Sequence, residues 1–155
     1  MHRALYLLFN EGYHGASAKN TVRVELCQEA MRLSALLREH PSTRTPAALA
    51  LSALMALHAA RLPSRLDESG DLQPLEEQDR SSWNQSLIAE GRRLLDDSAT
   101  GDEVTSYHIE ASIAAVHAAA PSLAATDWNA IVMLYDTLGR VAPSGVGELN
   151  RAIAI

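Results

Sequence analysis

Residues 45–61 read TPAALALSALMALHAAR, and this stretch decides the fold class. Thr45 is a residue type that caps helix N-termini, and Pro46 suits the first helical position because it lacks an N–H that would go unpaired there. Behind them alanine and leucine fill most positions, so a helix here is apolar nearly all round. Other elements must surround such a helix in water. The sequence therefore predicts a helix over Pro46–Arg61 as the most buried element.

Outward from this segment, apolar residues recur at helical spacing, and no run alternates as a half-buried strand does. The first expected helix covers about residues 2–11 and ends at Gly12 as a left-handed cap, and the second begins after a cap at Asn20 or Thr21 and ends before Pro41. Further helices are expected at about 80–97, 103–119 and 128–141, the last of these capped by Thr126 or Asp127. A final helix is expected after Pro143. The apolar face of the second helix is expected to comprise Val24, Cys27, Met31, Leu33 and Leu37.

Residues 62–78 interrupt the helical pattern with turn-forming proline, aspartate and glycine. Leu66 and Leu72 flank this turn as the two sides of a short hairpin would, so a small β bridge is expected between them. The prediction is an all-α fold of about seven helices in antiparallel hairpins, with one long loop at 62–78 and one helical domain over 1–155.

The segment around Trp128 carries a repeat-like pattern. Trp128, Ile131, Val132 and Tyr135 follow the spacing W-x2-L-G-x2-Y of the first tetratricopeptide helix, with Val132 where that pattern prefers glycine. Small residues in the preceding helix, at Ala111, Ala115 and Ala118, are expected to receive this bulky face. A generic antiparallel bundle would place the same large residues in its core, so spacing alone leaves tetratricopeptide-like repeat and bundle both open.

Composition limits the function. The net charge is −6 and the 13 Lys and Arg residues are scattered, so direct nucleic acid binding is not expected. Cys27 is the single cysteine and lies among apolar neighbours, which favours a core thiol in a reducing compartment, the cytoplasm. The most apolar window, residues 47–60, is expected to be too short to cross a bilayer.

Motifs for catalysis and cofactors are absent from the sequence. The six histidines form no i, i+4 pair and no zinc spacing, no G-x-S-x-G is present, and no glycine-rich loop carries the Lys-Ser/Thr of a phosphate site. We therefore expect no catalytic, cofactor-binding or metal-binding residues and no cofactor.

A set of charged and aromatic residues remains as the candidate site for partner contacts or for clamping the loop. Arginines paired with carboxylates could fix the loop against the helices by bidentate hydrogen bonds, whereas acid–base chemistry would need a cleft and shifted pKa values. Trp83 could be a core anchor for the loop or an exposed contact for a partner. The candidate residues are Asn10, Glu11, Tyr13, Arg61, Arg65, Asp67, Glu77, Asp79, Arg80 and Trp83.

Three further segments carry a resemblance to a known family: YLLFNEGY at residues 6–13, EEQDRSSWNQSLIAEG at 76–91, and TDWNAIVMLYDTLGRVAPSGVGELNRAIAI at 126–155. Together with 26–33, 51–61 and the loop residues 65–72, they make nearly the whole chain similar to the tetratricopeptide-like C-terminal extension of bacterial extracytoplasmic-function (ECF) RNA polymerase sigma factors. The first segment matches unchanged. Departures are Glu77 for aspartate, Ser82 for arginine, and Gly145, Gly147 and Glu148 for larger or apolar residues.

The resemblance implies a regulatory domain that acts in transcription initiation through protein contacts with RNA polymerase, the sigma core domains, or both, without catalysing a reaction. It also implies that promoter-reading domains precede the chain and that further helices follow it. The alternatives are a free-standing tetratricopeptide-like peptide-binding adaptor and a small-ligand sensor or enzyme that uses the loop carboxylates and His58. An apolar stripe at the end, Leu149, Ile153 and Ile155, is expected to pack onto the preceding helix, or else to form a homodimer contact or meet a further repeat.

Overall fold

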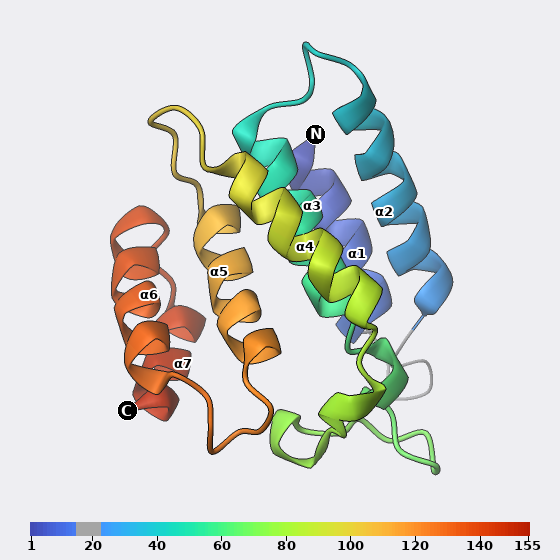
Figure 1. Cartoon of the computed structure of the whole chain (residues 1–155), viewed down its shortest axis with the longest axis vertical. Helices are drawn as coiled ribbons and strands as arrows, with labels where there is room; N and C mark the ends of the chain where they lie inside the picture. Colours follow the sequence, from blue (N-terminus) through green and yellow to red (C-terminus); the bar gives the residue numbers. More distant parts are fainter. Residues whose placement is uncertain (15–22) are drawn as a thin grey trace.

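The computed structural model describes residues 1–14 and 23–155, and these residues are helical almost throughout (Figure 1). They form seven α-helices and three short 3-10 helices: α1 His2–His14, α2 Val24–Glu39, α3 Pro46–Ala59, η1 Leu62–Ser64, η2 Leu75–Glu77, η3 Arg80–Ser82, α4 Gln85–Ser98, α5 Ser106–Ala119, α6 Trp128–Val141 and α7 Gly145–Ala154. The extended pairing within the described part is one antiparallel bridge, Leu66 with Leu72. The predicted all-α fold and the predicted bridge are both confirmed.

Consecutive helices pack as antiparallel hairpins, α1 with α2, α3 with α4, and α5 with α6, and α7 then packs on α6 (Figure 1). Helix α3 also contacts α1, α2 and α5, which makes it the centre of the arrangement. Because α1 and α5 both lie against α3, the first helices of the three hairpins are neighbours. This arrangement brings residues from distant parts of the sequence onto one shared face.

Helix α3 is the most buried element, as predicted. The Thr45 side chain accepts a hydrogen bond from the backbone N–H of Ala48 at 3.2 Å, so the expected cap is present. With η1, the span Pro46–Ser64 is long and apolar enough to cross a membrane, which corrects the expectation that this region is too short. However, 78% of its most apolar window is buried inside the protein, as in the core helix of a soluble fold. No other span in the described ranges passes this test.

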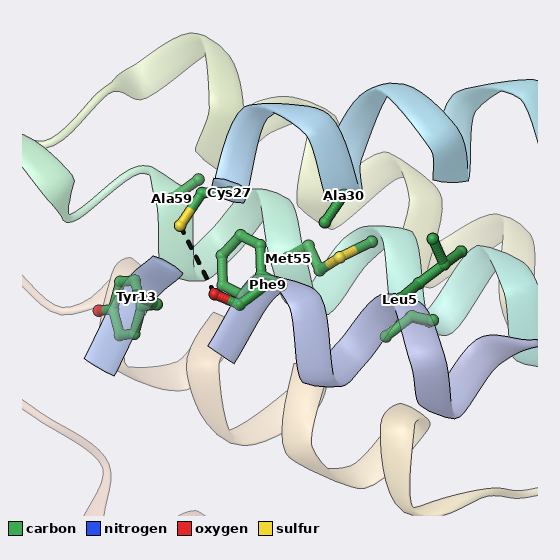
Figure 2. Packing of buried hydrophobic residues seen from close by; sticks show 8 residues of the cluster. Leu5, Phe9, Tyr13, Cys27, Ala30, Met55 and Ala59 are labelled. Atoms are coloured by element: carbon green, nitrogen blue, oxygen red, sulfur yellow. Dashed lines mark hydrogen bonds between the residues drawn. The ribbon is translucent and has the colours of Figure 1, made fainter. Parts of the chain in front are cut away.

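Gly12 does not end the first helix; α1 continues through it to His14. A Cβ on Gly12 would lie 2.7 Å from the backbone oxygen of Arg23 and 2.9 Å from both the backbone nitrogen and Sγ of Cys27. Glycine is therefore required here for close approach of α1 to α2, and the left-handed cap was a wrong prediction. Cys27 is fully buried beside Phe9 and donates its thiol hydrogen to the Phe9 carbonyl (Figure 2). Burial raises the pKa of this thiol to about 11, as expected for a core thiol.

We expect Gly12→Ala to destabilise the protein by about 3 kcal/mol, because the new methyl group would meet backbone atoms that only a shift of α2 can move. Gly139→Ala on α6 is the matched control, since its Cβ would meet nothing within 4 Å. That control should be neutral or stabilising by about 0.5–1 kcal/mol through helix propensity. Urea unfolding of both variants measures the difference; equal stabilities would show that α1 and α2 are not in close contact at Gly12.

Two predicted helix starts lie too early. The segment predicted as one helix over 80–97 divides into η3 and α4, because the Asn84 side chain accepts from the N–H of Leu87 and begins a new helix. The next helix starts at Ser106 rather than 103, where Thr105 and His108 form a reciprocal cap. Asp127 caps α6 as expected, whereas the proposed caps Asn20 and Thr21 lie outside the described residues.

The hairpin of α5 and α6 differs from prediction in the face that α5 presents. Ile109 and Ile113 of α5 meet Ile131 and the partly buried Trp128, Val132 and Tyr135 of α6. The alanine stripe instead faces the earlier helices: Ala111 packs with Leu49, Leu54 and Leu94, and Ala115 and Ala118 pack near Trp83. The large residues of α6 thus rest on isoleucine, while small residues allow α5 to approach α3 and α4 closely.

The C-terminal stripe does not pack onto α6 as expected. Leu149, Ile153 and Ile155 are 60%, 72% and 83% exposed, and Ala154 is the residue of α7 that enters the cluster with α6. The stripe therefore remains open to solvent in the single chain.

Candidate functional site

The loop after α3 is held to the end of α1 by Arg65. Its Nε donates to the backbone oxygen of Tyr13 at 3.1 Å, and its guanidinium carbon lies 4.0 Å from the centre of the Tyr13 ring. A guanidinium over an aromatic face adds cation–π attraction to the hydrogen bond. Two predicted candidates, 52 positions apart in sequence, are thus brought together.

Trp83 anchors the other end of the loop. Its ring is 3% exposed and packs with Leu57, Ala60 and Ile88 from α3, the turn after it and α4. Its indole N–H donates to Oγ of Ser64 at 2.8 Å. The guanidinium carbons of Arg61 and Arg80 lie 5.5 and 4.9 Å from the centre of the indole. The side chain is therefore a core anchor between two cations rather than an exposed contact.

Arg80 connects the loop to the C-terminal end of α5. One of its terminal nitrogens donates to the backbone oxygens of His117 and Ala120. The last carbonyls of a helix lack partners within the helix and carry partial negative charge, so a cation satisfies them well. Gln78 completes the attachment: it accepts from Nε of Arg61 at 3.2 Å and donates to the backbone oxygen of Gln73.

The carboxylates have a different role from the one predicted. Asp67 accepts from the backbone N–H groups of Ser69 and Asp71, and Asp79 accepts from Ser81, so both shape local turns. Glu77 is exposed. Among the described residues, no candidate arginine lies within salt-bridge distance of these acids, which corrects the expected arginine–carboxylate clamp. The arginines instead hold the loop through backbone oxygens and aromatic rings.

The two candidates on α1 lie apart from this loop contact. Glu11 is exposed and pairs with Arg23, which precedes α2, at 3.7 Å. Asn10 is partly buried on α1. Neither residue is joined to the Trp83 cluster by a hydrogen bond among those of the described residues.

Beside the clamped loop lies a pocket of about 420 Å³ on the face shared by the hairpins. Its lining includes three histidines, Arg61 and residues at the start of α7. The lining residues come from α1, α3, α5, α6, α7 and the loop: Tyr6, His14, His58, Arg61, Leu75, Glu110, Ile113, Ala114, His117, Tyr135, Leu138, Ser144, Val146, Gly147 and Asn150. Among the candidates for partner contacts or loop clamping, Arg61 alone lines this pocket; His58, named for the alternative small-ligand site, lines it as well.

The histidines of the pocket have pKa values below the usual value for a free histidine. Burial, and next the charge of Arg61, lower the pKa of His58 to about 3 and that of His117 to about 4. Burial and the charge of Arg65 lower the pKa of His14 as well. The Nδ1 atoms of His58 and His117 are buried and have no hydrogen-bond partner in the described part of the chain. A buried polar atom without a partner is uncommon and marks a place where a ligand group could bind.

Glu110 is the carboxylate that lines this pocket. It accepts a hydrogen bond from the Tyr6 hydroxyl at 2.5 Å, and burial raises its pKa although that bond opposes the shift. The loop acids proposed for acid–base chemistry with His58 do not line the pocket. Within residues 1–14 and 23–155, no three His, Cys, Asp or Glu side chains come together as a metal site would require.

Sequence reasoning missed the pocket because its parts are single residues on separate helices. His14, His58 and His117 share no spacing signal, and they meet because α1, α3 and α5 lie side by side. The available hint was a histidine on an apolar helix, as at His58, which the alternative small-ligand site used.

Comparisons with known proteins give a family but no activity. A model of a "Family of unknown function (DUF6596)" matches residues 1–99. The chain is also 41% identical over 152 residues to "Uncharacterized protein R00370" of Rhizobium meliloti (strain 1021). That alignment covers 97% of this chain and 36% of the relative, so the chain spans about a third of that protein's length. No solved structure matches the chain.

Proposed function

This chain belongs to the family of unknown function DUF6596, and from that premise we propose that it is the regulatory, protein-interaction C-terminal domain of an ECF-type RNA polymerase sigma factor. It acts in transcription initiation, in the cytoplasm, by contacting RNA polymerase, the sigma core domains, or both. It catalyses no reaction. The sequence resemblance supplies the identity of the partners, and the geometry supplies the reason for a binding role.

The observation that carries the proposal is the convergence of the resembling segments. Tyr13 comes from the first segment, Arg65 from the loop and Trp83 from the segment after it, and these residues hold one end of the helical array together. The residues that make the chain similar to the sigma-factor extension thus attach the loop to the helices in one arrangement. The loop acids are used in turns. This arrangement, with exposed apolar residues on α7, favours recognition of a protein.

The size of the relative also supports this proposal. The relative extends well beyond the part that matches, which leaves room for polymerase-binding and promoter-binding domains in a protein of this kind. The scattered cations and the net charge of −6 favour protein contacts over DNA contacts for the matched part itself.

Binding to purified proteins tests the proposal. Labelled chain is titrated with core RNA polymerase and, separately, with the sigma core domains of the longer protein, at two salt concentrations. We expect saturable binding, micromolar or tighter, to at least one of them. Leu149→Glu, on the exposed α7 stripe, should weaken this binding, whereas Arg92→Glu, at an exposed position of α4, should not. Absence of saturable binding to both would refute the sigma-factor assignment.

A peptide-binding adaptor is the second candidate, favoured by the pocket on the face shared by α1, α3, α5 and α7. Stacked helical hairpins commonly bind extended peptides on such a face. This candidate function is favoured if the chain binds neither RNA polymerase nor the sigma core domains but does bind peptides.

A further inference from the structure

Arg61 is a cation without an anion. Its Nε donates a hydrogen bond to the side-chain oxygen of Gln78, and Arg61 lines the pocket between the helices. Within the part of the chain that the structure describes, no carboxylate lies within salt-bridge distance of it, and no hydrogen bond is formed by its terminal nitrogens. An arginine that is partly buried in this way gains most from a planar anion that can accept two parallel hydrogen bonds.

The start of α7 also lines this pocket. Ser144, Val146 and Gly147 line it, and the Ser144 hydroxyl accepts from the N–H of Gly147. The first backbone N–H groups of the helix, at Gly145 and Val146, have no carbonyl partner within it. These donors and the positive end of the helix dipole favour an anion in the space in front of them.

The remaining polar groups of the lining are one acid, hydroxyl and amide groups, and histidines with lowered pKa values. Glu110 is the one acid among the lining residues, and it is bonded to Tyr6. His58 and His117 each keep a buried Nδ1 without a partner in the described residues. The lining thus holds one guanidinium, that of Arg61, and one carboxyl group, that of Glu110, whose pKa is raised by burial. The pocket also has apolar lining at Leu75, Ile113 and Leu138, which suits a short hydrocarbon arm that carries the anionic group.

We propose that this pocket binds a carboxylate group, held between the Arg61 guanidinium and the N-terminal turn of α7. One arginine matches the single charge of a carboxylate better than the double charge of a phosphate. The inference deepens the proposed function: in a sigma-factor domain the carboxylate is the side chain of an aspartate or glutamate of a protein partner. A free small carboxylate would use the same groups, and the experiment separates these two sources.

The test is an NMR titration of the chain alone, observing backbone amides of α7 and the Arg61 side-chain Nε–H. The probes are a capped pentapeptide with one central glutamate, the same peptide with glutamine, and free glutarate. We expect shifts at Val146, Gly147 and Arg61 with the glutamate peptide, and at least tenfold weaker binding of the glutamine peptide. Glutarate binding tenfold more tightly than the peptide would identify a free carboxylate as the ligand; the reverse order would identify a protein side chain.

Matched variants locate the site. Arg61→Gln should weaken glutamate-peptide binding at least tenfold, whereas Arg92→Gln, at an exposed position of α4, should leave it unchanged. Because Arg61 also contacts Trp83, a second pair avoids the risk of misfolding. Val146 is 69% exposed in the first turn of α7, so Val146→Glu should fold, place its own carboxylate in the pocket and abolish binding, while Val146→Gln should still bind.

Equal binding of the glutamate and glutamine peptides, or no binding of any probe, would overturn the carboxylate site. So would unchanged binding in Val146→Glu. These outcomes are independent of the sigma-factor assignment, because no polymerase or sigma core is present in the titration.

Discussion

Trp83→Ala is expected to lower the free energy of unfolding by about 3–5 kcal/mol, the usual cost of removing a buried aromatic side chain. The indole is 3% exposed, so its removal leaves a cavity among Leu57, Ala60 and Ile88. It also leaves the Ser64 hydroxyl without its donor and removes the ring that lies near both Arg61 and Arg80. The loop would then lose its anchor to the helices as well as its packing.

Two measurements separate loss of the anchor from a general loss of stability. Trp83→Phe keeps a ring but no N–H, so it should cost only about 1–2 kcal/mol. Limited proteolysis should cut Trp83→Ala first within residues 62–82 under conditions where α3 still resists, while Trp83→Phe is cut at the wild-type rate. If both variants unfold with wild-type stability, Trp83 does not anchor the loop.

Some parts of this fold could be predicted from the sequence alone. Segments whose signal is local were predicted well: Thr45 and Pro46 start α3, Asp127 starts α6, and the turn between Leu66 and Leu72 closes as a bridge. Each of these depends on neighbours within a few residues. For Trp83 the sequence left a core anchor and an exposed partner contact both open, and the 3% exposure of its ring decides for the anchor.

The antiparallel hairpins and the burial of α3 were predicted correctly, but several finer features that depend on contacts between particular helices were mispredicted. Glycine is typical of helix ends, which is why Gly12 was predicted to end the first helix. Its actual role is the close contact with Arg23 and Cys27, which exists only when two helices are packed together. The alanine stripe of α5 was assigned to α6, because periodicity identifies a face and not the element that meets it. The pocket was not predicted as one site: Arg61 and His58 were named for different roles, since they and His117 share no spacing and are joined only by the stacking of hairpins.

Acid is expected to destabilise the protein strongly between pH 6.5 and 4.5, through His58 and His117. Their folded pKa values of about 3 and about 4 lie below the value of 6.5 for a free histidine. In this window the unfolded chain therefore binds more protons than the folded chain, and stability falls as the pH falls. Summed over both residues, the loss from pH 7 to pH 4.5 is on the order of 4 kcal/mol.

The pH range in which stability is lost distinguishes the two histidines from the carboxylates. Exposed acids with lowered pKa values, such as Asp79 and Asp136, lose their contribution mainly below the range of free carboxylates, while the raised pKa of Glu110 opposes the loss of stability on acidification. Urea unfolding of His58→Gln/His117→Gln across pH 7 to 4.5 should show less than half of the wild-type pH dependence. His40→Gln, at an exposed site outside the pocket, is the matched control and should keep the wild-type slope.

The same titration bears on the carboxylate site, because an anion beside Arg61 would offset the charge that helps to keep the histidines neutral. Val146→Glu should therefore be less sensitive to acid than Val146→Gln, since the introduced carboxylate raises the pKa of the nearby histidines toward the free value. A wild-type protein whose stability is flat between pH 6.5 and 4.5 would show that water solvates these imidazoles in the folded state. The pocket would then be too open to hold neutral histidines against a buried arginine.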